Sequence, residues 1–519
     1  MASPTASQRY LSTRGGSYGF TFEEAVLKGL ASDNGLFIPE SIPELPADWQ
    51  SRWANLSFQD LAFEILSLYI SPSEIPASDL RDLITRSYST FRDPKITPVR
   101  PLAPEQDLHV LELFHGPTFA FKDVALQMVG NLFEYFLIRK NARIGETVDG
   151  KRHALTVIGA TSGDTGSAAI YGLRGKKDVS VFILHPLGRV SPIQEAQMTT
   201  VLDSNVHNLA VKGTFDDCQD IVKTLFAHPE MNRTHNLGAV NSINWARILS
   251  QIVYYFSAFF QLGGKSDLQF VVPTGNFGDV LAGYFAKRMG MPMRKLVIAT
   301  NENDILDRFC RSGRYAKNRG AEVAATLSPA MDILVSSNFE RLLWYLALEN
   351  ALGGKVPMPG EEPINEAKKQ AGETVNRWMN DLKTTGGTEV PQPVLDAMRR
   401  DFDSERVDDE TTIQTIKEIF QSRSYVLDPH TAVGVASALR KTNEKGTLVA
   451  LSTAHPAKFN EAVERALGGL EGYDFEANVR PEEFQGLEQR EKRVRVVERP
   501  DAELVKTVVE EMLQSEGKV

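Results

Sequence analysis

The stretch His115-Gly-Pro-Thr-Phe-Ala-Phe-Lys122-Asp123 separates a β-prone run from a long helical pattern. Residues 108–114 are mostly apolar and favour a short strand, which the Gly-Pro pair of the stretch then ends. From residue 124 to residue 137, apolar side chains recur at the spacing of one helix face. We therefore expect Lys122 where a turn enters a helix, with apolar neighbours on both sides.

This position has a chemical consequence for Lys122. Partial positive charge at a helix N-terminus and burial both disfavour an ammonium ion. A neutral amine is the form that condenses with a carbonyl to give a Schiff base. The simpler interpretation is a surface lysine whose aliphatic stem covers a phenylalanine, and spacing alone favours that simpler interpretation.

Chain length and net charge limit the possible domain number and partners before any motif is considered. The chain has 519 residues, which suggests about three domains, or two with elaborations. Its net charge of −10 argues against non-specific binding to nucleic acid, and an anionic substrate would need a local cluster of cations. No apolar run approaches the roughly 20 residues that a membrane span requires. We expect neither nucleic acid nor a membrane as a partner.

Cysteine and histidine usage is sparse. Cys218 and Cys310 are the only cysteines, they lie far apart in the sequence, and we expect both to be small buried residues. So few cysteines in a long chain indicate a reducing compartment, and we expect a cytoplasmic protein. The nine histidines show no metal-ligand spacing, so we predict no metal site.

The order of patterns predicts a helical region followed by an α/β body. Helical patterns at residues 22–31, 58–69 and 77–88 predict an N-terminal helical domain with a structural role, residues 1–100. Beyond residue 154, strand patterns alternate with helical ones, which indicates parallel α/β organisation. We predict a large α/β domain from residues 101–154 and 265–470, and a small one from residues 155–264.

Two further segments differ in composition from this body. Residues 353–410 are polar and rich in Gly, Pro, Lys and Glu, so we interpret them as a peripheral insertion or a mobile flap. Residues 471–519 are highly charged and form a C-terminal extension that ends in an amphipathic helix over residues 501–513.

The loop Thr274-Gly-Asn-Phe-Gly-Asp279 stands between a β run and a helix. Glycine lets the backbone approach an anion, and successive N–H groups at a helix N-terminus bind phosphate. Asp279 would be unfavourable beside a phosphate, so we expect its carboxylate to cap the helix through backbone N–H groups. Many such turns bind nothing, and this loop alone is a weak signal.

Two other loops precede helices. Thr161-Ser-Gly-Asp-Thr-Gly166 lacks the dinucleotide-binding spacing, but its hydroxyls suit an anion, and we expect its helix to begin at Ser167. Asn241-Ser-Ile-Asn-Trp-Ala-Arg247 opens a long helix expected over residues 243–261. Arg247 either offers its planar fork to a phosphate, or it is a solvated residue after an asparagine N-cap.

The motif His-Gly-Pro-Thr-x-Ala-Phe-Lys-Asp resembles the cofactor-lysine segment of the threonine synthase family. The resemblance to its fungal-type members runs nearly end to end, from Tyr10 to the C-terminal region. It implies a fold type II enzyme of pyridoxal phosphate (PLP), with a two-domain α/β core, a helical N-terminal domain and a C-terminal extension. It also places Lys122 where the family binds PLP through a Schiff base.

The same resemblance implies roles for the remaining motifs. Thr453 would face the pyridine nitrogen of PLP, with Ser452 as the alternative, and His455 would be structural. The implied ligands of the PLP phosphate are Gly275, Asn276, Phe277, Gly278 and Asp279. The implied substrate-binding residues are Ser162, Asp164, Thr165, Asn241, Ser242 and Arg247.

The implied reaction converts O-phospho-L-homoserine and water to L-threonine and phosphate, by γ-elimination and then addition of water at the β carbon. Lys122 would act in it as general base and acid. A related PLP-dependent dehydratase or lyase would share Lys122 and the glycine loops without needing Arg247. A non-catalytic relative that only binds its ligand is the other alternative. The expected partner is a small molecule, and the expected assembly is a monomer or a weak homo-oligomer.

Overall fold

The computed structural model describes residues 8–143, 152–238, 240–317, 323–442 and 445–517. Its larger sheet has six strands, of which five are parallel and one edge strand is antiparallel. In spatial order these strands are β13 (Phe402–Arg406), β10 (Leu296–Thr300), β9 (Gln269–Pro273), β14 (Leu448–Ser452), β4 (Leu108–Glu112) and β3 (Val99–Ala103). The predicted parallel α/β organisation is confirmed.

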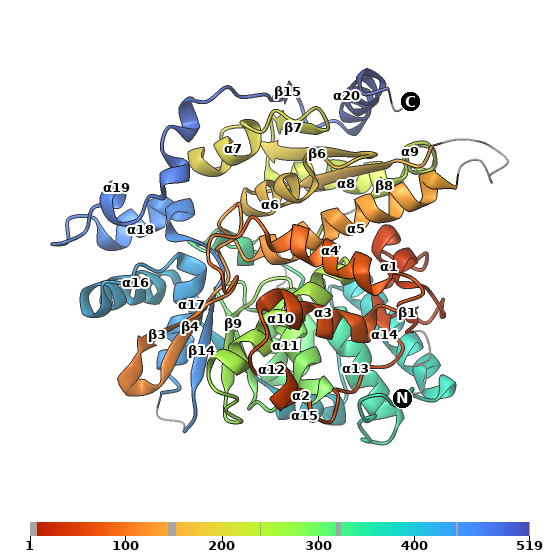
Figure 1. Ribbon diagram of the computed structural model, residues 1–519, viewed down its shortest axis with the longest axis vertical. Coiled ribbons are helices and arrows are strands. Elements are labelled where there is room, and N and C mark those ends of the chain that lie inside the picture. The colour runs from red at the N-terminus through yellow and green to blue at the C-terminus, as the bar shows by residue number, and fades with distance from the viewer. Residues whose placement is uncertain (1–7, 144–151, 239, 318–322, 443–444, 518–519) are drawn as a thin grey trace.

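A second, smaller sheet lies above the first in the view of Figure 1. All of its strand pairs are parallel. In spatial order its strands are β15 (Arg495–Val497), β7 (Val206–Val211), β6 (Val179–Pro186), β5 (Leu155–Ala160) and β8 (Leu237–Gly238). The helix α5 (Lys122–Ala142) packs against both α6 (Asp164–Leu173) and α10 (Trp245–Gln261), and so joins the two parts of the molecule.

The N-terminal region supplies helices that pack on this body. The helices α3 (Phe58–Tyr69) and α4 (Ala77–Tyr88) form over the predicted ranges, whereas α1 (Phe22–Lys28) ends three residues early because Gly29 takes a positive φ of 66°. The short strands β1 (Tyr10–Ser12) and β2 (Phe37–Pro39) pair antiparallel with each other. Arg14 then donates to both oxygens of Glu340, which anchors the N-terminal region to the body.

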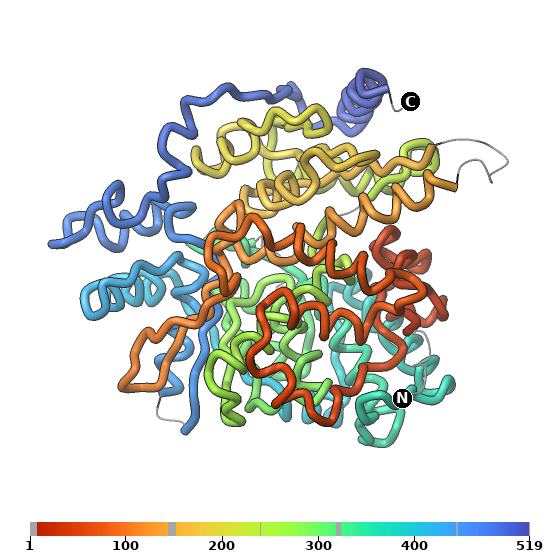
Figure 2. The backbone as a smooth tube through the Cα atoms, in the orientation of Figure 1, coloured from red at the N-terminus to blue at the C-terminus, as the bar shows by residue number. Residues whose placement is uncertain are grey.

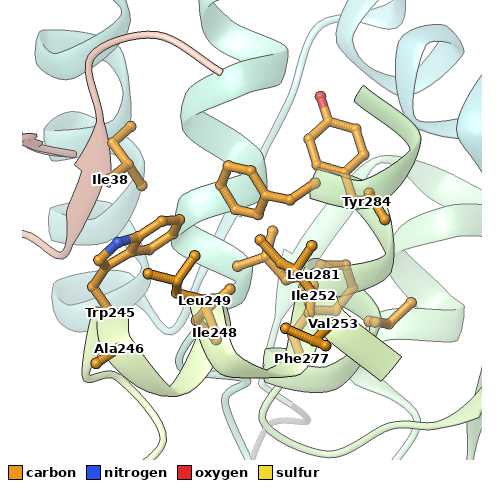
Figure 3. Close-up of a cluster of buried hydrophobic side chains, with 14 of the residues drawn as sticks. Ile38, Trp245, Ala246, Ile248, Leu249, Ile252, Val253, Phe277, Leu281 and Tyr284 are labelled. Atoms are coloured by element: carbon orange, nitrogen blue, oxygen red, sulfur yellow. The ribbon is translucent and has the colours of Figure 1, made fainter. Parts of the chain in front are cut away.

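The helix α10 is the centre of the hydrophobic core. Every residue from Trp245 to Phe259 is buried, and Figure 3 shows apolar side chains of α10 in one cluster with Leu281 and Tyr284 of α11 (Gly278–Met289). The helix begins two residues later than predicted because Asn244 caps it, accepting the N–H of Ala246 at 3.1 Å. Packing on all sides therefore holds the first turn of α10 in place.

Residues 353–410 are not a separate flap. They contain α14 (Asn365–Thr385), which packs on α13 (Phe339–Ala351), then α15 (Gln392–Asp401) and the edge strand β13. Five residues of β13 pair in register with β10. The strand sequence Phe-Asp-Ser-Glu-Arg carries one apolar residue, so its hydrophobic pattern gave no strand signal.

The C-terminal extension completes the smaller sheet. Figure 2 shows the chain crossing the top of the molecule after α19 (Phe475–Asn478) to reach β15 and α20 (Ala502–Ser515). There β15 pairs with β7, and α20 packs on α8 (Phe215–Ala227). The predicted helix over residues 501–513 is confirmed. In the ranges that the structure describes, no helix is long and apolar enough to cross a membrane.

Candidate active site

Lys122 is the first residue of α5, as the sequence predicted, and its side chain is buried. Only 6% of the residue is exposed, so the surface-lysine interpretation is wrong. Its amine lies 3.3 Å from Oδ2 of Asp164. Burial lowers the pKa of Lys122; the carboxylate of Asp164 opposes this shift, while the positive charges of Lys458 and Arg247 add to it. The environment thus favours a neutral amine.

The turn before Lys122 is held by its own side chains. Asp123 accepts hydrogen bonds from the backbone N–H and the hydroxyl of Thr118, at 2.8 and 2.7 Å. Gly116 packs so closely on this carboxylate that an added Cβ would lie 2.4 Å from the Asp123 Cβ. The glycine, threonine and aspartate of the motif therefore shape the turn that presents Lys122.

A second segment, residues 452–458, runs antiparallel along this turn. The N–H of Phe121 donates to the carbonyl of Thr453 at 2.8 Å, and the N–H of His455 donates to the carbonyl of Phe119 at 3.0 Å. The two segments leave the neighbouring parallel strands β4 and β14 at the same edge of the sheet. Strand order therefore brings residues more than 300 positions apart against Lys122.

The two candidate partners of the pyridine nitrogen differ in their contacts. Ser452 Oγ lies 3.2 Å from the hydroxyl of Thr431, whereas the hydroxyl of Thr453 has no hydrogen-bond partner among the described residues. Thr453 is the hydroxyl left available to a ligand. His455 accepts the N–H of Ala457 at 3.2 Å and packs on Phe119, which fits the structural role expected for it.

The loop between β9 and α11 presents unused donors. Within the described chain, no hydrogen bond engages the backbone N–H groups of residues 275–279. The carbonyls of the loop are instead occupied, because Ser336 donates to Gly275 O at 2.7 Å and Asn338 donates to Asn276 O at 3.0 Å. Free N–H groups at the start of a helix are a phosphate-binding arrangement.

Asp279 does not cap α11, and that expectation is wrong. Its Oδ1 accepts hydrogen bonds from the hydroxyls of Tyr254 and Tyr255, both on α10. Burial raises the pKa of Asp279 to about 7 against the effect of these two donors. The side chain therefore joins α10 to α11 and leaves the backbone N–H groups of the loop to an anion.

The loop at residues 161–166 holds Asp164 between two lysines. Its helix, α6, begins at Asp164 and not at Ser167, because the Thr161 hydroxyl accepts the N–H groups of Gly163 and Gly166 at 2.9 Å each. The carboxylate of Asp164 lies 2.8 Å from Lys458 Nζ through Oδ1, and it contacts Lys122 through Oδ2.

Burial alone would raise the pKa of Asp164, but Lys458 and Lys122 hold it well below its usual range. The carboxylate also accepts a hydrogen bond from Gln194 at 3.1 Å. Two other predicted residues of this loop are open to a ligand, since Ser162 is exposed and Thr165 is half-buried.

Arg247 is buried, which excludes the solvated arginine of the simpler interpretation. It is 4% exposed, and its Nη1 donates to the carbonyl of Val240 at 3.0 Å. Its Nε has no hydrogen-bond partner among the described residues, and burial lowers the pKa of Arg247 to about 10. A buried guanidinium N–H without an acceptor calls for an anion. Asn241 and Ser242 lie on the turn before it, exposed and half-buried.

Sequence reasoning missed the residues that connect these loops. Asn338 is fully buried, and its amide donates to Ser242 O at 3.1 Å and to Asn276 O at 3.0 Å. Ser337 donates to Asn276 Oδ1 at 3.1 Å and lies equally far from Ser242 Oγ. Neither residue belongs to a glycine loop. Lys458 ends the stretch Leu451-Ser-Thr-Ala-His-Pro-Ala-Lys458, where a lysine among small residues was the available signal.

These features fit PLP. The arrangement offers a buried amine at Lys122, together with two kinds of group that have no partner in the described part of the chain: the N–H groups of residues 275–279, which suit a phosphate, and the hydroxyl of Thr453. A family model for pyridoxal-phosphate-dependent enzymes matches residues 93–348. The fold and the site together define a PLP-dependent enzyme of fold type II.

Two further family models match the ends of the chain: the threonine synthase N terminus over residues 9–88, and the threonine synthase C-terminal region over residues 431–509. The threonine synthase of Saccharomyces cerevisiae is 58% identical, over 98% of this chain and 99% of that protein. That of Schizosaccharomyces pombe is 57% identical, over 98% of each.

Solved structures agree with these relatives. The crystal structure of threonine synthase from yeast superposes with a TM-score of 0.92 at 56% identity, covering 99% of this chain and all of that one. The PLP-bound threonine synthase from Brucella melitensis gives 0.85 at 40% identity, covering 98% and 99%. This chain belongs to the threonine synthase family of PLP-dependent lyases.

Proposed function

We propose that this chain converts O-phospho-L-homoserine and water to L-threonine and phosphate, a reaction of threonine biosynthesis. Family membership over nearly the whole chain supports this activity. The observation that carries the proposal is a second place for an anion, separate from the loop of residues 275–279. Arg247 offers a buried N–H there, and its charge acts on Lys122. A phosphorylated substrate of a PLP enzyme needs two such places.

PLP would be held by three parts of this chain. Lys122 would bind it through a Schiff base, the N–H groups of residues 275–279 would bind its phosphate, and Thr453 would face its pyridine nitrogen. Ser452 is the weaker choice for that nitrogen because its hydroxyl already contacts Thr431. When bound, PLP draws electrons from the substrate's carbon skeleton and so makes its C–H bonds more acidic.

Lys122 would move the protons. The Lys122 amine would remove and return protons at the substrate Cα and Cβ. The lowered pKa of Lys122 favours the neutral form of that amine, which is the form that accepts a proton. Desolvation by the surrounding core supplies much of this effect.

The substrate phosphate would lie at the N-termini of α6 and α10. Thr165, Asn241, Ser242 and Arg247 would hold it while the bond from Cγ to oxygen breaks, and water would then add at Cβ. Arg247 suits this role because it stays charged and its N–H groups are directed. Ser162 and Asp164 would complete the substrate-binding set, with Asp164 orienting Lys122.

We further propose a cytoplasmic enzyme that acts on a small molecule, binds no nucleic acid, and is a monomer or a weak homo-oligomer. Burial raises the pKa of the thiols of Cys218 and Cys310 to about 12, so both are unreactive, as suits a reducing compartment. A dehydratase would leave Arg247 Nε without an acceptor. A non-catalytic binder would have no use for the lowered pKa of Lys122.

The direct test is to mix the purified protein and PLP with O-phospho-L-homoserine. We expect threonine and inorganic phosphate in equal amounts, measured by amino-acid analysis and a phosphate assay. Phosphate release without threonine would support another PLP-dependent lyase, and no turnover would support the non-catalytic alternative.

A further inference from the structure

Lys458 is a buried cation that has no role in the reaction proposed above. It lies in the 3₁₀ turn Pro456–Phe459, and it is 1% exposed. Its amine makes two contacts at 2.8 Å, one with Asp164 Oδ1 and one with the carbonyl of Thr118. Taking a lysine out of water is costly unless its partners are well placed, so a purely incidental position is unfavourable.

The two contacts attach Lys458 to both parts of the site. Thr118 belongs to the turn that presents Lys122, and the hydrogen bonds between residues 119–121 and 453–455 hold that turn beside Lys458. Asp164 belongs to the loop at the start of α6, in the smaller sheet's part of the molecule. Lys458 therefore fixes the position of the Asp164 carboxylate relative to Lys122.

Asp164 is shared unequally between two amines. Among the described residues, Lys458 has two oxygen acceptors at 2.8 Å, whereas Lys122 has one, at 3.3 Å. An ammonium ion is better stabilised by the closer and more complete set of acceptors. The distances therefore make Lys458, and not Lys122, the closer partner of the Asp164 carboxylate.

We propose that Lys458 is a positioning residue for Lys122: it engages the carboxylate of Asp164 and places its own positive charge near the Lys122 amine, and so keeps that amine available as a base. The inference rests on the proposed role of Lys122. It assigns to Lys458 no contact with substrate or cofactor.

Other charged groups near Lys122 and Asp164 either raise or lower the pKa values of these two side chains. Arg247 of α10 adds to the effect of Lys458 on the pKa of Lys122, while Asp164 opposes it. His430, in α17 (Pro429–Leu439), favours the ionised form of Asp164, and the charge of Lys458 also acts on Asp123 of α5. Removing the charge of Lys458 takes away the closer of the two amines that contact Asp164, so the pKa of Lys122 should rise.

The test measures the Lys122 amine in full-length protein freed of PLP, without any turnover. Acetic anhydride acetylates neutral amines, and mass spectrometry gives the rate at Lys122 against pH, with exposed Lys223 as an internal reference. In Lys458→Met we expect the midpoint of Lys122 acetylation to rise by about one pH unit or more. Lys458→Arg keeps the charge and should stay near wild type.

A second variant should shift the midpoint of Lys122 acetylation in the opposite direction. Asp164→Asn removes the carboxylate that favours the Lys122 ammonium, so its midpoint should fall below that of wild type. In the holoenzyme, Lys458→Met should move the acid limb of kcat to higher pH, with little change in KM for phosphohomoserine. A purely structural role would lower kcat at every pH without moving this limb.

Two results would overturn the inference: a wild-type midpoint in folded Lys458→Met, or the same shift in Lys458→Arg as in Lys458→Met. Melting temperatures establish that each variant is folded, and Lys458→Gln replaces Lys458→Met if the latter is not. Borohydride reduction of wild-type holoenzyme, mapped by mass spectrometry, tests Lys122 separately. Label on another lysine would refute the proposed role of Lys122 and leave the acetylation result as it stands.

Discussion

The loop of residues 275–279 and the turn of residues 241–247 both suit an anion, but they are built in opposite ways. The loop offers backbone N–H groups at a helix start, with its carbonyls held by Ser336 and Asn338. The turn offers a side chain, the buried guanidinium of Arg247. Backbone donors cannot move away from their ligand, which suits a resident cofactor. A charged side chain adds strength that is specific to one substrate, which suits a leaving phosphate.

The two places are also tied together. The amide of Asn338 donates to a carbonyl in each, and Arg341, which is itself buried, holds Asn338 by donating to its Oδ1. One buried asparagine thus sets the spacing between the proposed cofactor phosphate and the proposed substrate phosphate. Substitutions at Lys122, at Arg247, in the loop of residues 275–279 and at Asn338 should therefore have different and separable effects.

The largest effect is expected at Lys122, which both places serve. Lys122→Ala removes the proposed cofactor link and the proposed base together, so kcat should fall by more than about 10³-fold. The visible absorbance of bound PLP should shift to that of unlinked cofactor. A spectrum and a rate like those of wild type would show that another residue carries the chemistry.

The next effect is expected at Arg247. Arg247→Ala leaves the substrate phosphate short of a charge-assisted contact in a buried place, which should cost about 2–5 kcal/mol, or roughly 30- to several-thousand-fold in kcat/KM. Arg247→Lys should recover little, because lysine lacks the planar fork. The PLP absorbance should remain normal in both variants. Steady-state kinetics with phosphohomoserine measure the effect.

A smaller effect, on the cofactor alone, is expected at Gly275. An added Cβ would lie 3.0 Å from the carbonyl oxygen of Ala330 and from the Cα of Met331, so Gly275→Val must displace the loop. We expect PLP affinity to fall about 10-fold or more by titration. Gly278→Ala is the matched control, because its Cβ has 3.4 Å to its nearest neighbours. Equal PLP affinity in both folded variants would argue against PLP binding by the loop of residues 275–279.

The smallest effect is expected at Asn338, and it should appear both in PLP binding and in the reaction with phosphohomoserine. Asn338→Ala leaves the carbonyls of Ser242 and Asn276 without this donor, which should cost about 1–3 kcal/mol in stability. Affinity for PLP and kcat/KM for phosphohomoserine should both fall by a few-fold. A change in one of them alone would show that Asn338 does not couple the two places. Urea unfolding and the two binding measurements check this prediction.

The parts predictable from sequence were those that depend on neighbouring residues. The turn before Lys122, the strand-loop-helix order and the glycine loops all follow from local patterns, and the family resemblance added their roles. The missed contacts join distant parts of the chain. Lys458 reaches Thr118, 340 positions away, and Asn338 reaches Ser242 across 96 positions, so no local pattern announces either one.

Asp279 shows the same limit. Its place at the start of a helix predicts a cap, but two tyrosines of a helix packed alongside take its carboxylate instead. Tertiary packing therefore overrode a local preference that was reasonable on its own. The edge strand β13 was missed for a related reason, because pairing with β10 and not hydrophobic alternation defines it.

Inhibition by inorganic phosphate tests the separation of the two places most directly. Phosphate should compete with phosphohomoserine in the wild type, and Arg247→Ala should weaken that inhibition by an order of magnitude or more while PLP titration is unchanged. Gly275→Val should do the reverse, weakening PLP binding while phosphate still inhibits. If phosphate inhibition survives Arg247→Ala unchanged, Arg247 does not bind the substrate phosphate, and the two-place account is wrong.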